Sequence, residues 1–203
     1  RVQITGGVVT AKGGSGGAGI GGGRNTGAGT VEITGGVVTA KGGSGSAAGI
    51  GNGPGADDGS LVLRSGTVFA QGSTPDLDVN CRMTTPGGEA VLYAQGFTHR
   101  ENQADWSCLV LGDGTARWYG ANNRIRSTLP LMLNGGQDLT VPESGTLTVV
   151  GSLTMQNATL RVQGSCTADT MAVEAGSTLL VEEGGYLLNR QDFTLQKGAS
   201  ARN

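Results

Sequence analysis

Pairs of carboxylates are the first residues in this sequence whose spacing suggests chemistry. A glycosidase needs two carboxylates across one sugar-binding groove, about 5 to 10 Å apart. Asp57 and Asp58 lie between glycines at 55 and 59, in a turn where Asp is favoured by backbone geometry alone. Turn formation is therefore the better interpretation for that pair. The candidate pairs are Asp57 with Asp58, Asp76 with Asp78, and Glu101 with Asp105.

The sequence lacks the motifs that a calcium site or a catalytic serine would require. A calcium site on Asn52, Asp57 or Asp58 would call for the Gly-Gly-x-Gly-x-Asp spacing of calcium-binding β-rolls, which the sequence lacks. His99 is the single histidine, and no serine lies in a Gly-x-Ser-x-Gly elbow between a strand and a helix. We therefore expect no catalytic residue, no metal site and no cofactor.

An aromatic-rich stretch is the one local feature that suggests binding. Five of the eight aromatic residues fall between positions 93 and 119. Aromatic rings stack on sugars and anchor interfaces, which indicates a glycan or protein contact surface. The alternative is that these rings form a small core of the stretch itself. The candidate ligand-binding residues are Tyr93, His99, Arg100, Trp106, Arg117, Trp118 and Tyr119.

Composition narrows the class of protein. Glycine supplies 39 of 203 residues, against a usual share of about 7%. The 14 basic and 16 acidic residues are nearly balanced, so we expect no nucleic-acid partner. No apolar run reaches the roughly 20 residues of a membrane span. The spacing of Cys81, Cys108 and Cys166 fits no metal site and leaves open a Cys81–Cys108 disulfide with Cys166 free.

An internal repeat predicts the strands of this chain. Residues 2–16 and 31–45 have the same text apart from Gln3 against Glu32, and a decayed third copy spans 61–73. Each copy holds three short runs rich in β-branched residues, with glycine at the corners. A period of this length is typical of stacked architectures. In a parallel β-helix the equivalent inward positions stack: Ile4 on Ile33 and Leu63, Val9 on Val38 and Val68, and Ile20 on Ile50.

The fold we expect is all-β, a single-stranded right-handed parallel β-helix (solenoid) with an inserted β-hairpin segment. Residues 1–73 form glycine-rich rungs of 29 or 30 residues, and 74–128 form an aromatic-rich insertion or decorated rung with a hairpin around Asp113-Gly114. Residues 129–203 continue the β-helix with shorter rungs of about twenty residues, and helix content is near zero.

The repeat text also carries a resemblance. Residues 4–23, Ile-Thr-Gly-Gly-Val-Val-Thr-Ala-Lys-Gly-Gly-Ser-Gly-Gly-Ala-Gly-Ile-Gly-Gly-Gly, resemble the glycine-rich repeats of large surface proteins from Gram-positive gut bacteria. Such proteins are often described as adhesin-like or carbohydrate-binding. The likeness covers residues 1–73 and continues weakly in 88–94 and 139–143. It implies an exported, cell-attached, multi-repeat protein, and the start at Arg1 within a repeat indicates a piece of a longer chain.

Two functions follow as hypotheses from different classes. The first is a non-enzymatic segment of an exported bacterial surface protein, extracellular or at the cell surface. It would act as a rigid stalk or adhesin-like module, with a host or dietary glycan or a surface protein as the partner of the insert. The second is a carbohydrate-active enzyme, a polysaccharide lyase or glycosidase, on a β-helix scaffold. End-to-end self-association through uncapped rungs is a third expectation.

Overall fold

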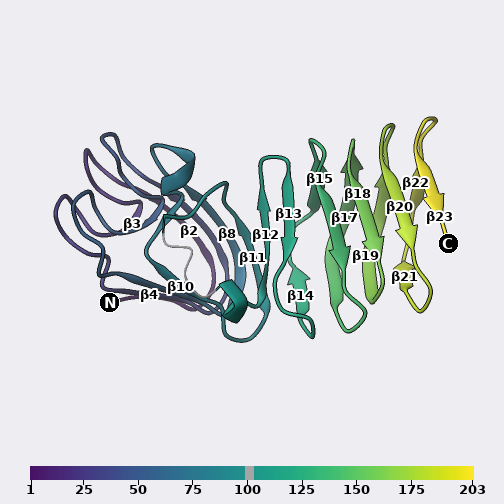
Figure 1. Ribbon diagram of the computed structural model, residues 1–203, viewed down its shortest axis with the longest axis horizontal. Coiled ribbons are helices and arrows are strands. Elements are labelled where there is room, and N and C mark those ends of the chain that lie inside the picture. Colours follow the sequence, from purple (N-terminus) through teal and green to yellow (C-terminus); the bar gives the residue numbers. More distant parts are fainter. Residues whose placement is uncertain (99–102) are drawn as a thin grey trace. The chain divides into compact units, whose positions relative to one another are not determined.

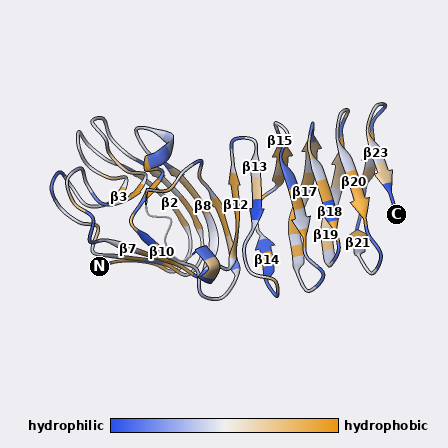
Figure 2. Ribbon diagram, viewed as in Figure 1, coloured by the Kyte–Doolittle hydropathy of each residue, from blue (hydrophilic) through white to orange (hydrophobic). Residues whose placement is uncertain are grey.

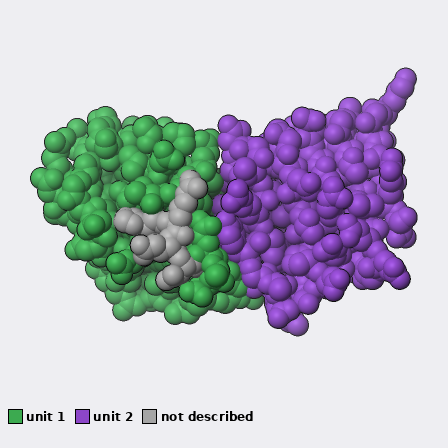
Figure 3. All heavy atoms as spheres, in the orientation of Figure 1, with its two compact units in different colours: residues 1–107 green, residues 108–203 purple. Residues whose placement is uncertain are grey.

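A computed structural model of the chain describes residues 1–98 and 103–203 (Figure 1). The chain divides into two compact units, residues 1–107 and 108–203, which are coloured separately in Figure 3. The described residues contain β-strands and two single-turn 3₁₀ helices and no α-helix, as the sequence predicts. Hydrophobic residues concentrate on the strands and polar ones on the connecting turns (Figure 2).

Unit 1 consists of short strands that join three parallel sheets. Its elements are β1 (Val2–Ile4), β2 (Val8–Lys12), β3 (Ile20–Gly21), β4 (Thr30–Ile33), β5 (Val37–Lys41), β6 (Ile50–Gly51), β7 (Ser60–Leu63), β8 (Ser65–Gln71), η1 (Pro75–Leu77), β9 (Val79–Asn80), β10 (Arg82–Thr84), β11 (Glu89–Tyr93) and η2 (Gln103–Asp105).

The chain visits these three sheets in a fixed order. Within unit 1 the sheets run β1-β4-β7-β10, β2-β5-β8-β11 and β3-β6-β9, so each sheet takes every third strand. All these pairings are parallel, as expected when equivalent segments of successive repeats lie next to one another in the same sheet. The strand order therefore describes a chain that coils through three sheets.

The predicted stacking of the repeat is confirmed in register. Ile4 pairs with Ile33, and Ile33 with Leu63. The ladders Val9–Val38–Val68 and Ile20–Ile50 are present as well. Ile33, Val38 and Ile50 are fully buried. Each rung thus covers the apolar face that a single rung would leave in water.

Parallel pairing continues beyond residue 73, into the segment that we expected to be an insertion. β9, β10 and β11 add to the three sheets in their usual order, and Phe97 forms a further parallel bridge to Val79. The glycine-rich text has decayed here, but inward apolar residues such as Met83 and Leu92 are still buried. The segment 74–128 is shared between the two units.

Unit 2 begins with a hairpin and continues as two parallel sheets. Its strands are β12 (Cys108–Gly112), β13 (Thr115–Trp118), β14 (Arg124–Ser127), β15 (Leu131–Asn134), β16 (Asp138–Val141), β17 (Thr146–Gln156), β18 (Thr159–Val162), β19 (Ser165–Val173), β20 (Thr178–Val181), β21 (Tyr186–Asn189), β22 (Phe193–Leu195) and β23 (Ser200–Arg202).

The predicted hairpin is confirmed, because β12 and β13 pair antiparallel with Gly112 opposite Thr115. One parallel sheet has the order β14-β17-β19-β21, with β15 on β17 and β22 on β19, and the other has β16-β18-β20-β23. Asp138 pairs with Thr159, and Thr159 with Thr178, which confirms a repeat of about twenty residues. The pairing of β17 with β19 shows a register shift between Val149 and Ser152.

Candidate functional site

The predicted ligand-binding residues that the structure describes are divided between the two units. Tyr93 and Trp106 belong to unit 1, whereas Arg117, Trp118 and Tyr119 belong to unit 2. His99 and Arg100 lie outside the described residues. The three residues of unit 2 come from β13 and the residue after it.

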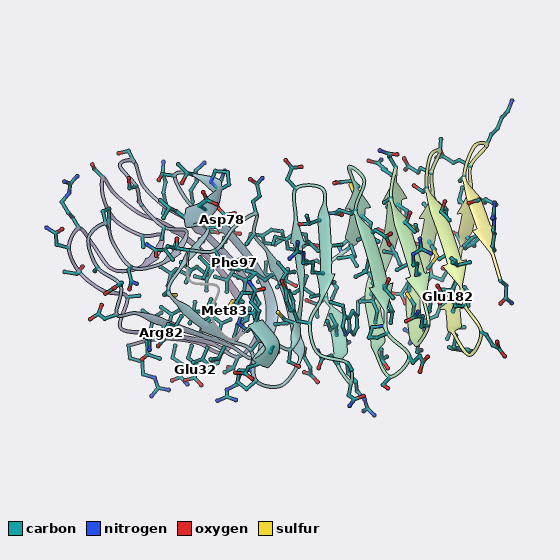
Figure 4. The ribbon with its side chains drawn as sticks, viewed as in Figure 1. Glu32, Asp78, Arg82, Met83, Phe97 and Glu182 are labelled. Atoms are coloured by element: carbon teal, nitrogen blue, oxygen red, sulfur yellow. The ribbon has the colours of Figure 1, made fainter. Side chains whose placement is uncertain are left out.

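Trp106 is a core residue of unit 1. Its side chain is 1% exposed, and its Nε1 donates a hydrogen bond to the carbonyl oxygen of Met83 at 3.1 Å. Its ring meets the ring of Phe97 edge-on, with centroids 5.0 Å apart and planes at 64°. Phe97 and Met83 are labelled in Figure 4. Buried aromatic pairs of this geometry stabilise a core, so for Trp106 the small-core alternative holds.

Tyr93 also uses its ring within unit 1. It stacks on Phe69 of the preceding strand in its sheet, with centroids 4.4 Å apart and planes at 13°. Burial raises the pKa of the Tyr93 hydroxyl to about 12, so it stays protonated and neutral at physiological pH. One face of the ring is therefore already occupied by Phe69.

Trp118 and its neighbours are the accessible part of the predicted site. Trp118 and Tyr119 are half-buried, and Arg117 is exposed. The Nε1 of Trp118 donates to the carbonyl oxygen of Gly120 at 2.7 Å. A Cβ built on Gly145 would lie 3.0 Å from Cζ2 of Trp118, so the indole packs against the turn that leads into β17. This fixed but incompletely covered ring is suited to stacking on a ligand.

Among the candidate carboxylates that the structure describes, Asp78 is the buried one (Figure 4). It is 4% exposed, and its two oxygens accept backbone N–H bonds from Gly72 at 2.8 Å and Gln95 at 2.6 Å. Burial raises its pKa above the ordinary value, and the amide hydrogen bonds oppose that shift. Asp78 therefore ties two loops together through its carboxylate.

The other carboxylates come from different loops. Asp57 and Asp58 are exposed between β6 and β7, and the carboxylate of Asp58 rests where a side chain on Gly27 would otherwise lie. Asp76 is exposed in η1 and Asp105 in η2, while Glu101 lies outside the described residues. Asn52 is fully buried and accepts a hydrogen bond from the amide of Ala28 at 2.9 Å, which makes it a core residue.

The three cysteines and the possible metal ligands are further candidate sites of chemistry. Cys81, Cys108 and Cys166 are buried, and no disulfide joins cysteines in the described part of the chain. Burial raises the pKa of the Cys81 and Cys166 thiols to about 12, which keeps them protonated and poorly nucleophilic. Across residues 1–98 and 103–203, no group of three His, Cys, Asp or Glu side chains is arranged to hold a metal ion.

A cluster of ion pairs lies on the surface of unit 1. Glu32 pairs with Arg1 and, at 3.5 Å, with Arg64 (Figure 4). The hydrogen bond from Arg1 is the main cause that lowers the pKa of the Glu32 carboxyl. Gln3, the single difference between residues 2–16 and 31–45, stands beside Glu32 in register, where a second glutamate would repel it.

Comparisons with known proteins address the repeat. A family model described as a beta helix repeat matches residues 2–24 and 31–54. Those ranges cover the two near-identical copies, and this part of the chain is a parallel β-helix repeat region. Neither a curated protein nor a solved structure matches the chain. No helix among the described residues has the length and apolar character needed to cross a membrane.

Proposed function

We propose that the chain is a non-enzymatic segment of an exported bacterial surface protein, where it acts as a rigid stalk or adhesin-like module. The observation that supports this most is the in-register stacking of near-identical rungs. The repeated residues are then explained by the geometry of the stack and need no catalytic role. Ile4, Ile33 and Leu63 form one such ladder. In the fuller form of the proposal, the coil is a single-stranded right-handed parallel β-helix, since parallel crossovers are almost always right-handed.

The contact function is proposed for the hairpin of the insert. Trp118, Tyr119 and Arg117 offer an aromatic surface and a cation on one short segment. A host or dietary glycan, or a surface protein, is the partner that suits such residues. Trp106 is not part of this proposal because its side chain is buried against Phe97.

The surface location can be tested directly on cells that make the protein. Antibodies raised against residues 1–203 are expected to label intact, unpermeabilised cells, or to detect the segment in the culture medium. An antibody against a cytoplasmic protein serves as the control for cell integrity. Labelling that appears only after the cells are permeabilised would contradict the proposal.

The glycan contact is tested with Trp118→Ala on a glycan array. If the indole stacks on a sugar ring, its removal should weaken binding roughly tenfold, as expected for the loss of about 1 to 2 kcal/mol of aromatic contact. Trp118→Phe keeps an aromatic face and should retain most of the affinity. Circular dichroism of both variants checks that the strands persist. Equal binding by Trp118→Ala and the unmodified chain would exclude this residue as the contact.

A further inference from the structure

The outer face of the sheet β14-β17-β19-β21 carries two columns of mostly polar residues that neither the repeat nor the hairpin explains. Strand register places Arg124 beside Thr146, Thr146 beside Ser165, and Ser165 beside Tyr186. The second column, two positions further along each strand, is Arg126, Thr148, Thr167 and Leu188. These positions alternate with buried ones such as Ile125, Leu147 and Cys166, so the columns face away from the core.

The charge on this face is of one sign. Arg124 and Arg126 are exposed, and neither forms an ion pair with any residue in the described part of the chain. The eight positions include two arginines and no acidic residue. By contrast, Arg161 and Arg190 of the same unit pair with Asp138 and Asp169. The face therefore presents two unneutralised guanidinium groups in a chain whose net charge is −2.

The remaining side chains supply hydroxyls, one aromatic ring and the exposed apolar side chain of Leu188. Thr146, Thr148, Ser165 and Thr167 can each donate and accept a hydrogen bond. Tyr186, at the far end of the first column, is 55% exposed. Neighbouring strands are about 4.8 Å apart and alternate residues along a strand about 6.6 Å, so these groups form a regular grid. Acidic residues occur in the turns that precede β17 and β21, at Glu143, Glu182 and Glu183.

We propose that this face, called here the Arg–Thr face, binds an extended anionic polysaccharide whose sugars carry carboxylates. Guanidinium groups pair with carboxylates in two-point hydrogen bonds, and two of them lie side by side on β14. The hydroxyl columns hydrogen-bond the sugar hydroxyls of successive residues across β17 and β19. Tyr186 stacks on the sugar that extends beyond the hydroxyls. The inference rests on the proposed glycan-contact function but uses residues other than the hairpin.

The test uses polygalacturonate as the probe and its methyl-esterified form as the uncharged match. The unmodified chain is expected to bind the free acid, to bind the ester at least tenfold more weakly, and to lose affinity as salt rises. Arg124→Gln/Arg126→Gln should weaken polygalacturonate binding roughly tenfold or more, because each charged hydrogen bond is worth about that factor. Tyr186→Ala should cost less, since one stacking contact is lost.

The control variant is Arg82→Gln/Arg202→Gln, which removes the same charge from two exposed arginines elsewhere. It should leave affinity within about twofold, since neither arginine belongs to the Arg–Thr face. An equal loss in both double variants, or equal binding of acid and ester, overturns the proposal. Tighter binding of inorganic polyphosphate than of polygalacturonate overturns it too, in favour of a phosphate polymer. Loss of array binding in Trp118→Ala with polygalacturonate binding intact separates the hairpin contact from the Arg–Thr face.

Discussion

Replacing Gly51 by alanine is expected to lower the free energy of unfolding of unit 1 by about 3 kcal/mol. Gly51 lies in β6 with φ at +137°, a conformation that residues with a side chain rarely adopt. A Cβ there would lie 2.4 Å from the carbonyl oxygen of Asn80 in the next rung. Because that oxygen belongs to paired backbone, relief of the clash requires the rungs to separate. Urea unfolding followed by circular dichroism measures the change.

Gly45→Ala is the matched control for this prediction. Gly45 lies in the same rung, also with positive φ, at +77°. Its nearest heavy atom to an added Cβ is the end of the Arg24 side chain, at 3.9 Å. The control therefore carries the backbone strain without the clash and should cost about 1 kcal/mol. If the two variants are equally stable, close approach of the rungs does not constrain the glycines.

These glycines show why so much of unit 1 follows from its sequence. The repeated text fixes the period, and the period fixes which residues stack, as for Val9, Val38 and Val68. The repeated sequence does not predict how far the parallel pairing continues once the glycine pattern is lost. β10 and β11 keep their places in the sheets although their glycine pattern has decayed. A strand needs only inward apolar side chains and a free sheet edge with which to pair. The few apolar residues of such a short strand are too weak a sequence pattern to predict it.

The candidate site was harder to predict because aromatic residues serve cores and ligands alike. Trp106 and Trp118 are close in the sequence and have the same chemistry, yet one is buried and the other half-exposed. Burial of each tryptophan depends on how its segment pairs with neighbouring strands. Residues 94–107 contain no alternating pattern from which that pairing could be predicted. Arg124 and Arg126 do alternate with Ile125, so their outward direction could have been anticipated. Their alignment with hydroxyls from other strands requires the register.

Trp106→Ala is expected to destabilise unit 1 by about 3 to 5 kcal/mol, the usual cost of removing a buried tryptophan. The variant loses the packing of the indole against Phe97 and leaves a cavity. It also leaves the buried carbonyl oxygen of Met83 without the 3.1 Å hydrogen bond from Nε1. Unfolding in urea, followed by circular dichroism, is the measurement because fluorescence would lose one of only two tryptophans.

The comparison with Trp118→Ala decides between the core and ligand interpretations of the aromatic cluster. Trp118 is half-exposed, so its truncation should cost about 1 kcal/mol of stability and act mainly on binding. Trp106→Phe restores most of the buried ring and should recover about half of the lost stability, while the hydrogen bond stays missing. A Trp106→Ala chain as stable as the unmodified one, but unable to bind glycan, would return Trp106 to the ligand site. The opposite pattern leaves the hairpin and the Arg–Thr face as the contact surfaces of unit 2.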